Sequence, residues 1–162
     1  MNDKVVRGCS IPDSVAHIAD VQTFMQKCIS DLVARACNHD RVKLLSPEME
    51  GFDAVHASHV LSNTEYMSPE YIKGKEMLGQ ALKHHYDHCD HHPEHFGGGI
   101  QSMNFLQLIE LVCDWSAAVR RHKNGNILRS IEQNQARFGY SDETKKFMIN
   151  TALFINDVTT GG

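Results

Sequence analysis

Histidines and aspartates occur in this sequence at spacings that could hold a metal ion. His39 and Asp40 are adjacent and follow a long stretch of helical pattern, so an imidazole nitrogen and a carboxylate can both reach one ion beside a helix end. Asp114 stands in the middle of the apolar segment LVCDW, residues 111–115. An ionised carboxylate in such a segment costs free energy unless a cation or strong hydrogen-bond donors compensate it. We therefore expect a metal site that includes these three side chains.

Two further side chains belong to the same hypothesis. Glu110 precedes Asp114 by one helical turn, so both carboxylates lie on one face of the predicted helix. Two carboxylates on a buried helix favour a metal, or another cation that bridges them. His17 has apolar neighbours at helical spacing, which predicts a side chain that faces inward or lies at the edge of the core. Such a histidine is either a ligand or a hydrogen-bonded structural group.

The chain contains eleven histidines, and six of them fall within residues 84–95. Not all six can be ligands. We predict that His85, which continues the apolar side of its helix, and His92 bind metal. His91 and His95 are expected to hold ligands in place or to bind phosphate. The alternative is a solvated histidine-rich loop that binds metal adventitiously.

The order of His17, the His39-Asp40 pair and Asp114 resembles the H…HD…D pattern of the HD superfamily of metal-dependent phosphohydrolases. In that superfamily the four residues come from separate helices of an all-α bundle and hold a divalent ion. The segment HDRVKL, residues 39–44, also resembles the HDxxK segment of its two-metal branches, in which the lysine assists a phosphate or a bound water. Those branches carry further histidines before the last aspartate.

The resemblance implies one or two divalent ions. Mn, Co, Ni, Zn or Fe would suit the mixed nitrogen and oxygen ligands, and Mg is an alternative. Six side chains are the predicted metal ligands: His17, His39, Asp40, His85, His92 and Asp114.

The chain also resembles, over nearly its full length, an uncharacterised phage-associated family of small helical proteins. The members of that family carry HDxSKL-, HHPEHF- and EMxCDW-like segments. The corresponding segments here are HDRVKL (39–44), HHPEHF (91–96) and ELVCDW (110–115). This resemblance implies a phage-encoded protein and supplies no established activity.

The function predicted from these residues is that of a metal-dependent phosphohydrolase acting on a nucleotide or another small phosphate ester. Bound ions would polarise a phosphoryl oxygen and lower the pKa of a bound water. Lys43, Glu110 and Glu94 are the candidate catalytic residues, with a glutamate or a cluster histidine as general acid or base. Four side chains are candidates for binding the substrate phosphate: Arg41, Lys43, His91 and His95.

Two other functions remain open at this point. Some HD-type proteins with extra histidines hold two irons and oxidise a C–H bond, and mixed histidine and carboxylate ligands also suit di-iron chemistry. A third interpretation is a non-enzymatic protein that contains a structural metal and binds a host protein or a signalling nucleotide.

Helical patterns place the candidate residues on separate elements. Apolar residues recur at helical spacing over five stretches: 15–37, 69–87, 105–121, 127–137 and 142–156. Ser46-Pro47-Glu48 and Ser68-Pro69-Glu70 each predict a helix start, with serine as the cap and proline at the first helical position. The sequence has no convincing alternating strand pattern. We predict an all-α, single-domain, compact bundle of five to six helices, HD-domain-like, over 1–162, with flexible ends at 1–10 and 159–162.

Composition narrows the partners and the compartment. The net charge of −4 gives no general attraction to nucleic acid. Five scattered cysteines, odd in number, are typical of reduced thiols. No signal-peptide pattern or membrane-spanning run is present, so we expect a cytoplasmic protein with no membrane partner, in the host cytoplasm if phage-encoded. The expected partner is a small phosphorylated substrate, and a homo-oligomer is an open alternative.

Overall fold

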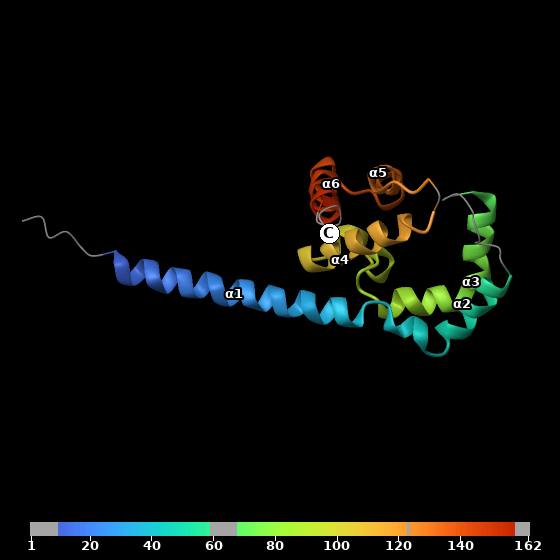
Figure 1. Ribbon diagram of the computed structural model, residues 1–162, viewed down its shortest axis with the longest axis horizontal. Helices are drawn as coiled ribbons and strands as arrows, with labels where there is room; N and C mark the ends of the chain where they lie inside the picture. The colour runs from blue at the N-terminus through green and yellow to red at the C-terminus, as the bar shows by residue number, and fades with distance from the viewer. Residues whose placement is uncertain (1–9, 59–67, 123, 158–162) are drawn as a thin grey trace, which may run out of the picture. The chain divides into compact units, whose positions relative to one another are not determined.

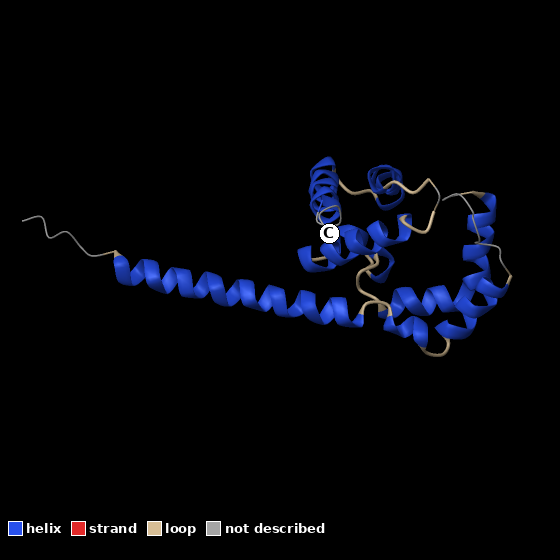
Figure 2. Cartoon of the chain, in the orientation of Figure 1, coloured by secondary structure: helices blue, strands red, loops and turns tan. Residues whose placement is uncertain are grey.

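The computed structural model describes residues 10–58, 68–122 and 124–157 (Figure 1). Its α-helices are α1 (Ile11–Asn38), α2 (Glu48–Ala57), α3 (Pro69–His88), α4 (Phe105–Val119), α5 (Ile127–Phe138) and α6 (Asp142–Asp157). Short 3-10 helices are η1 (Arg41–Leu44), η2 (Pro93–His95) and η3 (Gly99–Ser102). Figure 2 shows helices and loops, and no strand within the described ranges. The predicted all-α fold with five to six helices is confirmed.

The contacts of the chain divide it into two units, Met1–Cys37 and Asn38–Gly162. We describe each unit by itself, and the single HD-like domain over 1–162 stays a prediction. The predicted flexible ends fall outside the described residues, except for residue 10. No described helix combines the length and the apolar character needed to cross a membrane.

Nearly all described residues of the first unit belong to α1, a helix of 28 residues whose last residue, Asn38, is assigned to the second unit. Helical pattern was predicted over 15–37, and the helix extends further toward the amino end, beginning at Ile11 with Asp13 in its first turn. A negative charge there is favourable because the amino end of a helix carries partial positive charge. Near the other end, Arg35 pairs with Asp31, one turn earlier, at 2.7 Å. Both features stabilise α1 through residues that are close in sequence.

Side-chain caps mark the starts of α3 and α4 in the second unit. Ser68 accepts a hydrogen bond from the amide of Tyr71 at 3.1 Å, which confirms the start predicted for α3. Asn104 and Gln107 form a reciprocal capping box at the start of α4. α2 begins at Glu48 without a side-chain cap, so the serine cap predicted at Ser46 is wrong. Each cap satisfies amide groups that have no partner within the helix.

The core of the second unit lies among α4, α5 and α6. Its buried members are Ile100, Leu111, Val112, Ile131, Tyr140, Met148 and Ala152. α2 packs closely against α3, where a Cβ at Gly51 would lie 2.4 Å from the Cβ of Ala81. Glycine is needed there because any side chain would force the two helices apart. α2 and α3 also contact η1, and α3 contacts η2, so these helices help to position the neighbouring segments that carry part of the candidate site.

Candidate metal centre

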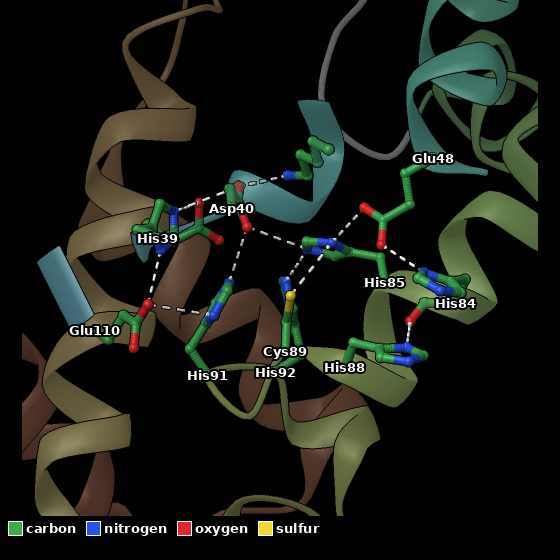
Figure 3. Close-up of polar contacts among 12 residues, drawn as sticks. His39, Asp40, Glu48, His84, His85, His88, Cys89, His91, His92 and Glu110 are labelled. Atoms are coloured by element: carbon green, nitrogen blue, oxygen red, sulfur yellow. Dashed lines mark hydrogen bonds and ion pairs between the residues drawn. The ribbon is translucent and has the colours of Figure 1, made fainter. Parts of the chain in front are cut away.

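The His39-Asp40 pair lies at a sharp turn between α1 and η1. Asp40 has a φ of 56°, in the left-handed region, which aspartate tolerates better than most residues. Its carbonyl accepts a hydrogen bond from the amide of Lys43 at 2.9 Å, which starts η1. The turn places the Asp40 side chain between His39 on one side and His85 on the other (Figure 3).

One oxygen of Asp40 lies among three imidazole rings. Asp40 Oδ1 is 3.2 Å from His85 Nε2 and 3.4 Å from His91 Nε2. His92 Nε2 is 2.9 Å from His85 Nε2. All four side chains offer ligand atoms within 4.8 Å of one another. Three imidazoles and one carboxylate form a ligand set that suits a divalent transition metal.

Two atoms of this group are buried without a hydrogen-bond partner among the described residues, Asp40 Oδ1 and His91 Nε2. Their separation of 3.4 Å is a close approach without hydrogen-bond geometry. An unsatisfied buried polar atom costs about 1–3 kcal/mol. A cation between them would satisfy both, so the residues present fit a metal ion.

The second oxygen of Asp40 faces a different group. His39 Nε2 lies 3.4 Å from Asp40 Oδ2 and 3.6 Å from Asp114 Oδ1. These three side chains form a second set of converging ligand atoms. Lys43 Nζ also contacts Asp40 Oδ2, at 2.6 Å. Asp40 therefore presents one carboxylate oxygen to each of two potential ion positions.

Two glutamates bind the far side of the candidate ligands. Glu110 Oε1 accepts from His39 Nδ1 at 2.8 Å and lies 3.4 Å from His91 Nδ1, so it joins the two groups. These three residues also form a third set of converging ligand atoms. A carboxylate on one ring nitrogen orients the imidazole and leaves the other nitrogen for a metal.

Glu48, the second of these glutamates, is the residue that sequence reasoning missed. Its side chain is fully buried, with 0% exposure. Its two oxygens lie 2.9 Å from His85 Nδ1 and 2.8 Å from His84 Nδ1 (Figure 3). It comes from α2, whereas both histidines come from α3. The only local signal at Glu48 is its place after Ser46-Pro47, which indicates a helix start and nothing about a distant histidine.

The electrostatics of the group differ from residue to residue. Burial would raise the pKa of Asp40, but contacts with His85, His91 and Lys43 hold that pKa well below its usual range. Burial, together with the neighbouring His91 and His85, lowers the pKa of His92 to about 3. Neutral imidazole is the form that binds metal, so His92 is ready to do so at neutral pH.

His39 is in the opposite situation. Hydrogen bonds with Asp114 and Glu110 raise the pKa of His39 to about 10. Burial would raise the pKa of Asp114, but its hydrogen bond with His39 lowers it. Without metal this pair is an imidazolium with a carboxylate, and a metal on His39 Nε2 must displace its proton.

Several predicted site residues have other surroundings. His17 is exposed on α1 in the first unit, and it is not in a described group of converging ligand atoms. Arg41 is exposed in η1. His95 is exposed and donates from Nδ1 to the carbonyl of Tyr86 at 3.0 Å. Glu94 pairs with Arg137. Their predicted roles in metal binding, phosphate binding and catalysis stay predictions.

A cavity of about 360 Å³ in the second unit reaches the candidate centre. His92 and Asp114, one from each ligand group, line it, and so does Glu94. This volume falls at the small end of the range usual for ligand pockets, roughly 300–1,000 Å³. A small molecule in this cavity would contact residues of both ligand groups.

Comparison with known proteins identifies a family but no characterised relative. No curated protein and no solved structure matches the chain. A family model described as "Family of unknown function (DUF5662)" matches residues 11–160, which include every candidate residue named above. The chain, with its converging histidines and carboxylates, belongs to the DUF5662 family.

Proposed function

We propose that this protein is a divalent-metal-dependent phosphohydrolase that acts on a nucleotide or another small phosphate ester. The observation that carries the proposal is the position of Asp40, whose two oxygens face two separate groups of ligand atoms. Two ions joined by one carboxylate are a common arrangement in enzymes that transfer or hydrolyse phosphoryl groups.

The distances between ligand atoms support one assignment of the ligands. Asp40, His85, His91 and His92 would hold one ion, and His39, Asp40 and Asp114 would hold the other. Divalent ions bound there would polarise a phosphoryl oxygen and lower the pKa of a bound water. Mixed nitrogen and oxygen ligands favour Mn, Co, Ni, Zn or Fe over Mg.

The remaining residues act on the substrate or on the ligands. Lys43 Nζ, 2.6 Å from Asp40 Oδ2, balances the negative charge of the carboxylates and would donate a charge-assisted hydrogen bond to a substrate phosphate bound at the ions. Glu110 contacts two imidazoles, so its role is to orient His39 and His91 rather than to move a proton. Glu94 lines the cavity and is the better candidate for general acid or base.

One observation favours a second candidate, a di-iron oxygenase. The group around Asp40 Oδ1 contains three imidazoles, a nitrogen-rich set that suits iron as well as zinc or manganese. Two equivalents of iron in the purified protein, together with the absence of phosphate release, would favour this function over hydrolysis.

The hydrolase proposal predicts phosphate release that depends on metal and on Asp114. Protein purified without a histidine tag, with Mn²⁺ or Co²⁺ restored, should release phosphate from at least one of a panel of nucleotides and simple phosphomonoesters. We expect Asp114→Asn to lower kcat/KM at least about 100-fold, because the loss of one charged ligand costs about 3 kcal/mol.

The matched control is Asp87→Asn, which removes an exposed aspartate that pairs with Lys83 on α3. This variant should keep full activity. Phosphate release that is equal with and without chelator would contradict the proposal. So would a metal-loaded protein that hydrolyses no member of the panel.

A further inference from the structure

We propose that the cavity beside the metal centre contains a second anion-binding subsite, formed by Lys75 with Arg129 and Arg137. The substrate is then a phosphate ester that carries another negatively charged group, remote from the phosphate that reacts. The statement that a phosphate reacts at the metal centre rests on the proposed function. The second subsite is argued from the residues that line the cavity.

The cavity connects the metal centre with these basic residues. His92 and Asp114 line it, and Lys75, Arg129 and Arg137 line it as well. The ring of Tyr86 lies 5.0 Å from the ring of His92, measured between centroids. At its other end, the hydroxyl of Tyr86 accepts a hydrogen bond from Lys75 Nζ at 3.3 Å. The side chain of Tyr86 therefore reaches from the candidate metal ligand His92 to the ammonium group of Lys75. A small substrate can span the same distance.

Lys75 lies close to another cation. Its ammonium donates to the phenol of Tyr86, and the charge of Arg137 acts on it more strongly than the charge of Glu94. Glu94 itself pairs with Arg137. Burial lowers the pKa of Lys75, and the nearby Arg137 lowers it further. A bound anion would relieve both effects, because it stabilises two cations held close together.

The part of the cavity wall between the metal ligands and the basic residues suits a planar organic group. Trp115 and Phe138 line the cavity with their rings stacked, 6.0 Å apart at 22°. Asn126, Gln133 and Asn134 bring amide groups to the same cavity. Aromatic faces and amides together bind a planar ring that carries its own donors and acceptors. The substrate class is therefore an ester with an aromatic, hydrogen-bonding body and an anionic group at each end.

The test compares two probes that differ by one anionic group, adenosine 5′-monophosphate and adenosine 3′,5′-bisphosphate. Each is titrated calorimetrically into the full-length protein as purified, and free phosphate is measured in the same samples. We expect the bisphosphate to bind at least about tenfold more tightly, which is the usual gain from charge-assisted hydrogen bonds. If the protein hydrolyses the two probes, the preference is measured as the ratio of their kcat/KM values instead of the ratio of their dissociation constants.

Two variants test whether the basic residues cause the preference for the bisphosphate. Lys75→Met should reduce the preference for the bisphosphate to about twofold or less. Arg129→Gln alters an exposed side chain of the same cavity and should also weaken the preference, without risk to the fold. Lys83→Met, on the same helix as Lys75 but with a side chain 66% exposed, is the control that keeps the full preference.

The outcomes for the anion subsite and for the phosphohydrolase can be told apart. Equal binding of both probes, binding of neither, or a preference that survives in both Lys75→Met and Arg129→Gln would overturn the anion subsite. A preference for the bisphosphate without phosphate release from any ester would support the subsite and contradict the phosphohydrolase.

Discussion

Replacing Asp40 with asparagine is expected to remove metal from both groups at once. Asparagine keeps the size of the side chain and tolerates the left-handed backbone at this position, where φ is 56°. The neutral amide cannot serve two cations as a carboxylate does. If each ion loses about 1.5–3 kcal/mol of charge-assisted interaction, the combined affinity falls roughly 100- to 10,000-fold. Metal content after dialysis, measured by mass spectrometry of the elements, tests this expectation.

Asp53→Asn is the matched control for Asp40, because Asp53 is an exposed aspartate on α2. It should keep the metal content of the natural protein. If Asp40→Asn retained the same number of ions with the same affinity, Asp40 would not bridge the two groups. Circular dichroism of both variants separates loss of metal from loss of fold.

Replacing Glu48 with glutamine is expected to weaken metal binding about 10- to 100-fold, the usual effect of losing a partner that orients a ligand. Glu48 accepts hydrogen bonds from His84 and His85 at once. Glutamine can accept only one of these bonds and presents an amide donor to the other ring. His85 then carries its proton on Nε2 in part of the molecules, and that nitrogen can no longer bind metal. Titration with Co²⁺, followed by its visible absorption, measures the affinity.

Glu50→Gln serves as the control for Glu48, because Glu50 lies exposed on the same helix. Its affinity for Co²⁺ should match that of the natural protein. A purely structural role of Glu48 would show as a lower free energy of unfolding for the metal-free protein, with an unchanged Co²⁺ affinity and spectrum. That pattern would contradict the positioning role.

Local sequence patterns were sufficient for the helices and for part of the candidate site. The all-α fold could be predicted because apolar periodicity and helix caps such as Ser68 are local signals. The predicted metal ligands His39, Asp40 and Asp114 converge, and His85 and His92 converge with Asp40. Adjacent histidine and aspartate pointed to His39 and Asp40, and a carboxylate in an apolar helix pointed to Asp114. His85 was predicted because it continues the apolar side of its helix.

The parts that could not be predicted depend on contacts between distant segments. His91 was expected to bind phosphate or support a ligand, yet its Nε2 faces Asp40 Oδ1 because the loop before η2 turns it inward. Glu48 reaches His85 across 37 positions of sequence, through the close packing of α2 on α3. No local pattern encodes that approach. The metal-binding role of His17, which lies in the first unit, stays a prediction that rests on the order of residues in the sequence.

The most direct test of the central claim, that Asp40 joins two ions, is electron paramagnetic resonance of the full-length protein titrated with Mn²⁺. Two-metal sites hold their ions about 3.5–4 Å apart, close enough for magnetic coupling. The account predicts two Mn²⁺ per chain and a coupled signal that grows as the second ion binds. A single uncoupled Mn²⁺ signal that saturates at one ion per chain, or no bound Mn²⁺, would contradict it.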